Sequence, residues 1–597
     1  MKGLNGFDEY IQSAMESWHC PGVAIAVVSG DKPVYTRAFG VRDAEFGDPL
    51  TPETRFPIAS ITKSFTAASV ALLVDDGLLD WNKPVREYMP EFVLNDSYAT
   101  EHITVRDMLS HRSGLPRHDL SAWRLDLPRG ELVRRMRHLK FSATFRERFI
   151  YNNLMYYVVP HLVETLTGYD WEHYVANRLF GPLDMDATNF APEFDGDVPL
   201  ASGYRLEREP DGSVSDLVRV PFGAHTKLSP GGAGAIFSTL SDMSAWVGLH
   251  ANAGRFGEKQ IVGEENISLM RQPHTVLPTA GVAEALGTSE MSAYGLGWMI
   301  DAYRGYTVCH HGGGVEGHTL HAGFVAAGSN RDAEREAVGV VVLTNIAFSA
   351  VAQTLFYEAI DRVLGLSERD WNTRFHAVLD PLHEARGQSR ETTETERIPD
   401  APPTHGWEAI CGSFEADGYP QLEVRLAGGD MRDGDMDAGG IGEERPELEA
   451  RLAGSLDWLP LRHIHYNVFE WYIRDFDMRV KAHLLVNDQG EPDAISIPIE
   501  PEVEPVVFRR APVVLSPEQR AAVEGQYEPE IEGLTFSIFA SGEAVMFSQS
   551  GSSPQKMHPY RADSAVIGFK LEGSRIDAML ASDGTAERLV LKSSGMT

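Results

Sequence analysis

The chain has 597 residues, more than one hydrophobic core usually holds, so several domains are expected. Its 86 acidic residues outnumber 53 basic ones, and the formal net charge of −33 disfavours nucleic acids and anionic membranes as partners. The three cysteines lie far apart and show neither a disulfide framework nor a zinc spacing. The first ten residues lack an apolar signal core, which predicts a non-exported, cytoplasmic protein.

Hydrophobic patterning predicts one large mixed domain at the amino-terminal end. Residues 21–28 and 34–40 alternate as strands around a turn, and the chain to about residue 240 is mainly helical. Three further strands are expected at 306–309, 318–326 and 337–344, followed by a helix over 347–364. This order predicts an α/β (α+β) domain over residues 1–383 whose sheet joins both ends of the segment.

The carboxyl-terminal third has a different character. Residues 384–403 lack an apolar period and are predicted to form a linker. Beyond them the chain is mostly short strands with a weak repeat, since Gly412-Ser413-Phe414-Glu415 is echoed by Gly525-Gln526-Tyr527-Glu528. Two small antiparallel β-barrel domains are therefore expected, over residues 404–512 and 513–597.

The most informative motif is Ser60-Ile61-Thr62-Lys63, at the start of a helix expected to end near Gly77. Residues three apart on a helix share a face, so the Lys63 amine can reach the Ser60 hydroxyl and activate it as a nucleophile. Ser-x-x-Lys also occurs at Ser29 and Ser553, but only the copy at Ser60 leads into a sustained apolar helix. The alternative reading of any single copy is a solvated helix or turn.

A second motif is Tyr151-Asn152-Asn153, the one Tyr-x-Asn in the sequence. A tyrosine close to two cations can ionise below its usual pKa of about 10 and serve as a base. An asparagine can hold a lysine amine and a substrate carbonyl with one side chain. The alternative is a loop before a helix, with asparagine as its cap.

A third motif is the histidine- and glycine-rich stretch from Tyr306 to Gly317. Strand alternation places His311 on the same face as Thr307 and Cys309, and the glycines after it admit a ligand and leave N–H groups free for an oxyanion. A tight glycine turn is the alternative. A zinc site is a weaker one, because no Cys or acidic residue completes a known spacing with His310, His311, His318 and His321.

In this order the three motifs resemble those of the serine β-lactamase and penicillin-binding-protein-like hydrolases, specifically the class C β-lactamase, D-aminopeptidase and esterase branch. The resemblance covers roughly residues 7–365 and includes Asp107 to Pro116, Gly231 to Thr239 and Tyr294 to Trp298. It implies a β-lactamase-like domain with an antiparallel sheet flanked by helices. The tail resembles the lipocalin-like β domains appended to some of these enzymes, and residues 548–560 are a candidate for a loop that reaches the cleft.

The resemblance also implies residue roles, with no metal and no cofactor. Ser60 would be the acylated nucleophile, Lys63 and Tyr151 would share general base and acid work, and Asn153 would orient Lys63 and the substrate. His311 matches the position of the lysine in Lys-Thr-Gly. The remaining roles fall to Gly313, which closes that triplet, and to the N–H groups of Ser60 and Gly314, which would form the oxyanion hole.

The function expected is that of a serine hydrolase acting through a Ser60 acyl-enzyme on a small ester or an amide or peptide bond, as a D-aminopeptidase-like peptidase or a carboxylesterase. Histidine in place of lysine at His311 weakens the site for a β-lactam carboxylate. An acyltransferase, a β-lactamase and, last, a non-catalytic binding protein are the alternatives. A small-molecule substrate is the expected partner, and the sequence allows a homo-oligomer without requiring one.

Overall fold

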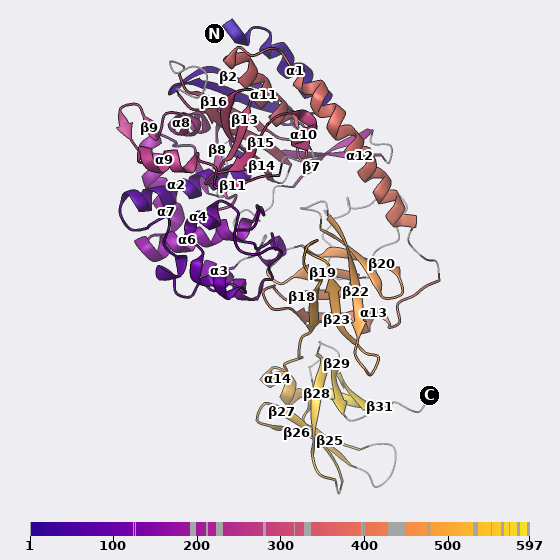
Figure 1. Ribbon diagram of the computed structural model, residues 1–597. Helices are drawn as coiled ribbons and strands as arrows, with labels where there is room; N and C mark the ends of the chain where they lie inside the picture. The colour runs from indigo at the N-terminus through magenta and orange to yellow at the C-terminus, as the bar shows by residue number, and fades with distance from the viewer. Residues whose placement is uncertain are drawn as a thin grey trace.

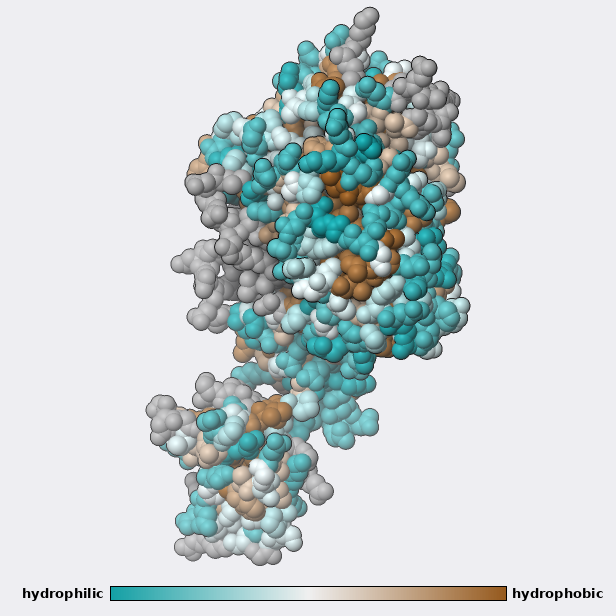
Figure 2. All heavy atoms as spheres, turned by 90° about the vertical axis from the view of Figure 1, so that its left-hand side faces the viewer, coloured by the Kyte–Doolittle hydropathy of each residue, from teal (hydrophilic) through white to brown (hydrophobic). Residues whose placement is uncertain are grey.

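The computed structural model shows an amino-terminal domain followed by two β domains (Figure 1). It describes the chain except for residues 1, 123–124, 126, 191–198, 210–212, 222–230, 279–281, 316, 328–335, 396–397, 399, 428–447, 456, 474–477, 529–534, 551, 563–565, 572–573, 582–584 and 594–597. In the space-filling view the carboxyl-terminal end forms a smaller lobe beneath the main mass (Figure 2). None of the described helices has a stretch apolar and long enough to cross a bilayer.

A nine-stranded antiparallel sheet forms the centre of the amino-terminal domain, in the order β11-β12-β13-β14-β15-β16-β1-β2-β3. Strand β1 pairs with β16 from Val23 opposite Thr344 to Ser29 opposite Val338, so the sheet joins both ends of the domain, as predicted. The strands are β1 Gly22–Ser29, β2 Lys32–Asp43, β3 Asp48–Pro49, β11 Thr275–Val276, β12 Ser292–Tyr294, β13 Met299–Tyr303, β14 Tyr306–Val315, β15 His318–Val325 and β16 Val338–Thr344.

Both faces of this sheet are covered, which explains why β1 and β16 are apolar throughout. Side chains alternate along a strand, so Val23 and Ile25 enter one core while Ala24 and Ala26 enter another. The first core lies under α1 (Phe7–Ser17) and α11 (Val351–Leu364), and the second contains α8 and the helical half of the domain. Site residues project into the second core.

The helical half packs around α2 (Thr62–Asp75) and α6 (Asn153–Thr167), which are buried on nearly all sides. The other α-helices here are α3 Ser97–His102, α4 Val105–Leu109, α5 Arg129–Arg135, α7 Trp171–Val175, α8 Leu240–Ala251, α9 Glu264–Met270 and α10 Val282–Leu286. The small strands are β4 Phe56–Pro57, β5 Asn189–Phe190, β6 Gly203–Arg208, β7 Val214–Val220, β8 Ile236–Ser238, β9 Arg255–Phe256 and β10 Lys259–Gln260.

Part of the expected linker, residues 384–403, is helical. Helix α12 (Trp371–Thr395) begins with Trp371 and Phe375 buried against α11 and then continues into the stretch that lacks an apolar period. Once a helix is nucleated, each added residue costs little free energy, so a packed first half can propagate into a polar second half. Figure 1 shows this helix running from the amino-terminal domain towards the β domains.

The first β domain is a closed eight-stranded barrel. Its first and last strands pair at Phe414 opposite Arg510, and alternate residues such as Leu422 and Val424 fill its interior. The strands are β17 Gly412–Glu415, β18 Leu422–Leu426, β19 Leu448–Leu452, β20 Leu459–His465, β21 Val468–Ile473, β22 Met478–Val486, β23 Pro492–Ile497 and β24 Val506–Arg510, with α13 Trp407–Ile410 before them.

The second β domain is a seven-stranded sheet in chain order, where a second barrel was predicted. No pairing joins β25 to β31 among its described residues. Closure requires a matching number and stagger of strands, which a weak sequence repeat does not report. The elements are α14 Pro517–Val523, β25 Gly525–Tyr527, β26 Phe536–Ser541, β27 Ala544–Gln549, β28 Gln555–Ala562, β29 Val566–Leu571, β30 Ser574–Leu580 and β31 Ala586–Ser593.

Candidate active site

Ser60 lies in a 3-10 turn, Ala59–Ile61, immediately before α2. The turn is anchored because β4 pairs with β8 and the Ile58 N–H donates to the Ile236 carbonyl at 2.9 Å. Ala59 has a φ of 47°, an uncommon left-handed conformation for a residue with a side chain. Such backbone strain is frequent beside functional groups and here presents a partly exposed Ser60 at the start of a helix.

Lys63 is fully buried behind the serine. Its Nζ donates to Ser60 Oγ at 3.1 Å and to the Ala233 carbonyl at 2.9 Å. Burial, reinforced by the positive charge of Arg117, lowers the pKa of Lys63 well below its ordinary value. The amine next to the serine is therefore one that readily loses its proton and can then accept another.

Tyr151 also belongs to this group. Its ring centroid is 4.9 Å from Lys63 Nζ, and Ser60 lies close enough to act on the pKa of its hydroxyl. Burial raises the pKa of Tyr151 above its usual value, and Ser60 and the charge of Arg117 offset only part of that rise. The expectation that Tyr151 ionises readily was wrong, because loss of hydration outweighs the nearby cations.

The two asparagines that follow Tyr151 have different partners. Asn152 caps α6 by accepting from the Met155 N–H at 3.0 Å, as the alternative reading of the motif expected. Asn153 is buried, and its Nδ2 donates to Asp119 Oδ1 at 3.0 Å. Its orientation of Lys63 and the substrate stays a prediction.

His311 lies on β14 within the same core and is almost completely buried. Burial and then the charge of Lys63 lower the pKa of His311 to about 3, so the imidazole is neutral at physiological pH. Its Nδ1 lies 2.6 Å from the Gly312 carbonyl, which can only accept, so the proton is assigned to Nδ1. Nε2 then accepts from the Tyr294 hydroxyl at 2.9 Å.

The glycines after His311 continue β14 instead of forming the alternative tight turn. A Cβ on Gly313 would lie 2.5 Å from the Ile58 carbonyl oxygen, so only glycine lets the strand pack against the Ser60 turn. Gly314 is exposed, and nothing lies within 4 Å of the place where its Cβ would be. The oxyanion role of the Ser60 and Gly314 N–H groups stays a prediction.

The other histidines of this stretch do not form the zinc site considered as an alternative. His310 Nδ1 lies 3.0 Å from His321 Nε2, and His310 Nε2 lies 3.0 Å from Asp301 Oδ2. His318 contacts the Ala201 carbonyl at 3.1 Å. The described part of the chain contains no cluster of three or more His, Cys, Asp or Glu residues suited to a metal ion.

Several groups at the site were not singled out from the sequence. The His111 ring centroid lies 4.4 Å from that of Tyr151, with the two rings tilted by 33°, and the guanidinium carbon of Arg117 lies 5.6 Å from the Tyr151 ring centroid. Asp119 accepts from Arg117 Nε at 2.6 Å as well as from Asn153. His111 lies in a stretch that carried the family resemblance, whereas nothing in the pattern marked Arg117 or Asp119.

Comparison with known families agrees with this geometry. The family model described as Beta-lactamase matches residues 7–363, more than half of the chain. This chain belongs to the beta-lactamase family. The match and the hydrolases among its relatives identify the protein as a serine hydrolase with a β-lactamase-like domain.

The matches to two relatives extend beyond the β-lactamase-like domain. An unguisins hydrolase of Aspergillus campestris is 30% identical over 70% of this chain and 77% of its own length. An unguisins hydrolase of Aspergillus violaceofuscus is 28% identical over 83% of this chain and 88% of its own length. Protein flp of Staphylococcus aureus is 24% identical, over 49% of this chain and 55% of its own length.

A solved structure shares the fold. The octameric penicillin-binding protein homologue from Pyrococcus abyssi superposes with a TM-score of 0.52 and 22% identity, covering 85% of this chain and all of that chain. The coverage includes part of the β region as well as the amino-terminal domain, because 85% exceeds the family match.

Proposed function

We propose that the protein hydrolyses a small ester or an amide or peptide bond through an acyl-enzyme on Ser60, as a D-aminopeptidase-like peptidase or a carboxylesterase. The observation that carries the proposal is the 3.1 Å contact between Ser60 Oγ and a buried Lys63 whose pKa is lowered. An uncharged amine at this distance can accept the hydroxyl proton as Oγ attacks the substrate carbonyl.

The opposite pKa shifts of Lys63 and Tyr151 support different roles for the two residues in proton transfer. Lys63, with its lowered pKa, is the base that takes the Ser60 proton. Tyr151, with its raised pKa, is a neutral phenol that can donate to the leaving group and take its proton back from Lys63. Water then attacks the acyl-enzyme, passes a proton to Lys63 and releases the acid with Ser60 restored. The N–H groups of Ser60 and Gly314 are proposed to hold the oxyanion of both tetrahedral intermediates.

The neutral His311 supports this substrate class over β-lactams. A residue that is uncharged at physiological pH offers no cation for a β-lactam carboxylate, whereas a lysine in its place would. The unguisins hydrolases add support for hydrolysis, since they match most of this chain.

The test is a substrate panel with wild type and Ser60→Ala. The panel contains short-chain p-nitrophenyl esters, L- and D-amino-acid p-nitroanilides and nitrocefin. We expect turnover of an ester or a D-amino-acid anilide, a loss of about 10³-fold or more in Ser60→Ala, and labelling of Ser60 by a fluorophosphonate. Equal turnover by the two proteins would rule out the proposal, and nitrocefin as the best substrate would redirect it to a β-lactamase.

A further inference from the structure

A short segment, Arg117-His118-Asp119, connects the catalytic groups to the rest of the molecule. Arg117 lies against the Tyr151 ring at 5.6 Å, and its charge contributes to the lowered pKa of Lys63. Asp119 holds Arg117 at 2.6 Å and Asn153 at 3.0 Å. A displacement of this segment would therefore change the surroundings of two proposed catalytic side chains and of Asn153 together.

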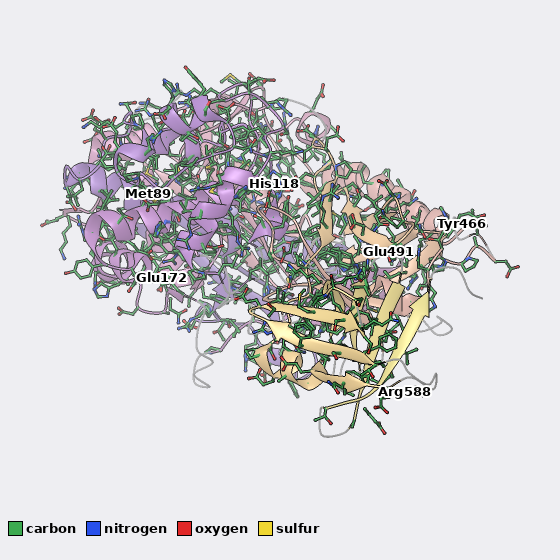
Figure 3. All side chains as sticks on the ribbon, turned by 90° about the horizontal axis from the view of Figure 1, so that it is seen from below. Met89, His118, Glu172, Tyr466, Glu491 and Arg588 are labelled. Carbon is green, nitrogen blue, oxygen red and sulfur yellow. The ribbon has the colours of Figure 1, made fainter. Side chains whose placement is uncertain are left out.

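The central residue of the segment is held in an unfavourable backbone conformation. His118 has a φ of 43°, in the left-handed region that residues other than glycine rarely adopt, and a 3-10 turn follows it. Such a conformation persists only where surrounding contacts fix it. His118 is 2% exposed, so those contacts enclose it, and Figure 3 shows it on the side of the amino-terminal domain next to the β domains.

The first barrel supplies part of this support. His118 Nε2 lies 2.8 Å from the Lys140 carbonyl, so Nε2 carries the proton and Nδ1 is left to accept from the Tyr419 hydroxyl at 2.5 Å. The His118 backbone lies close enough to Glu500 of the same barrel to lower the pKa of that carboxyl. Tyr419 lies between β17 and β18 and Glu500 between β23 and β24, so two separate barrel loops reach one residue.

The barrel loop that carries Tyr419 packs closely against the amino-terminal domain. A Cβ on Gly418 would lie 2.7 Å from Leu139 Cδ2 of the amino-terminal domain. Tyr419 and Glu500 are each 8% exposed, so their polar groups are largely removed from water. Removing one partner of such a contact leaves a buried polar group without a hydrogen bond, and the loss of that bond destabilises the folded state.

We propose that Tyr419 and Glu500 of the first barrel are positioning residues for the serine hydrolase reaction. They hold His118 in its left-handed conformation and thereby keep Arg117 and Asp119 against Tyr151 and Asn153. The inference rests on the proposed function, because its effect is on the Ser60 reaction. It gives the barrel a part in catalysis beyond attachment to the amino-terminal domain.

The test compares Tyr419→Phe, Glu500→Ala and Glu500→Gln in the full chain. Tyr419→Phe removes only the hydroxyl, and Glu500→Gln keeps an oxygen that can accept from the His118 N–H, whereas Glu500→Ala does not. The control is Glu502→Gln, which breaks another barrel contact, the 2.6 Å ion pair between Glu502 and Arg148. The assays are kcat, KM, the thermal midpoint and the rate of Ser60 labelling by a fluorophosphonate.

We expect kcat and the labelling rate to fall about tenfold or more in Tyr419→Phe and Glu500→Ala, with folded protein and little change in KM. Glu500→Gln should recover most of the loss, and Glu502→Gln should match wild type. The rising limb of kcat/KM against pH should move to higher pH in Tyr419→Phe, because an Arg117 displaced from Lys63 no longer lowers the pKa of its amine.

The inference would be overturned if both Tyr419→Phe and Glu500→Ala kept the wild-type kcat and labelling rate. It would also be overturned if their loss of activity only matched the fraction of unfolded protein.

Failure of the proposed function gives a different result. In that case wild type itself would show no turnover dependent on Ser60 and no label on that residue, whereas failure of the positioning role leaves wild-type catalysis intact.

Discussion

The two β domains differ in how they relate to the catalytic centre. The first barrel shares one continuous apolar core with the helical half of the amino-terminal domain, and it reaches His118 through Tyr419. The second domain has a small core of its own, and its described ion pair, Lys570 with Glu491, joins it to the barrel (Glu491 is labelled in Figure 3). The barrel therefore packs directly against the catalytic domain beside His118, whereas the described ion pair of the second domain is with the barrel.

The largest expected effect separates Lys63, the proposed base, from a lysine of the second domain. Lys63→Met should lower kcat by about 10³-fold or more, because Ser60 loses the amine that accepts its proton. The matched variant Lys570→Met should keep kcat within about twofold, because it breaks an ion pair that joins the second domain to the barrel. Steady-state kinetics on the best substrate of the panel provide the measurement.

The pH dependence of kcat/KM tests the role of Lys63 in a second way. The pKa of Lys63 is lowered, and only its neutral form accepts a proton, so wild-type kcat/KM should rise with pH through that lowered pKa and then level off. Lys570→Met should retain this rise. A Lys63→Met enzyme with wild-type kcat would contradict the role given to the amine.

A matched pair of core substitutions should distinguish the two β domains in stability and activity together. Phe508 of the barrel and Phe569 of the second domain are both fully buried, so each change to alanine should destabilise its own domain by about 3–5 kcal/mol. Phe508→Ala should also lower kcat, because the Phe508 ring packs 5.9 Å from the Tyr419 ring. Phe569→Ala should leave kcat unchanged below its unfolding transition; equal losses of activity would show that the second domain is part of the catalytic unit.

The stability of the barrel interface should depend on pH. Burial, and then the charge of Asp119, raise the pKa of Glu500 to about 7, and Arg117, Glu502 and the His118 backbone also act on it. The folded protein then binds a proton that the unfolded chain has released, so stability should fall as pH rises from about 4.5 to 7. Glu500→Gln should remove this slope and raise the free energy of unfolding at pH 7 and above by at most about 3 kcal/mol, measured by denaturant titration. A slope unchanged by the substitution would assign it to other groups.

The smallest expected effect concerns the contact between the β domains. Glu491→Gln breaks the partly exposed ion pair with Lys570, which should cost about 1 kcal/mol or less and leave kcat unchanged. The loss should shrink further at high salt, because ions screen such pairs. A large fall in kcat here would make the second domain a participant in catalysis.

The sequence predicted the parts of the catalytic domain that depend on local chemistry. The strands at both ends of the domain and the helix that follows Ser60 came from apolar patterning, which covers many residues and has a distinct period in each element. The contact of Lys63 with Ser60 came from their spacing of three residues, because a helical turn fixes that distance.

The predictions that failed concern effects which no local pattern records. The pKa of Tyr151 depends on how much water the folded chain removes from it. Closure of the second β domain, which its described residues do not show, depends on strand stagger. In the candidate cleft loop, residues 548–560, the described residues 548–549 belong to β27 and 555–560 to β28.

Sequence by itself determined the family, the order of the domains and the serine–lysine pair, because these follow from residue identity at short spacing. Tertiary structure alone decided that the pKa of Lys63 is lowered and that of Tyr151 is raised, because burial is the largest cause of both shifts. It also decided which β domain contacts His118. His118 and Tyr419 are 301 positions apart, and a contact over that separation is made by the packing of whole domains.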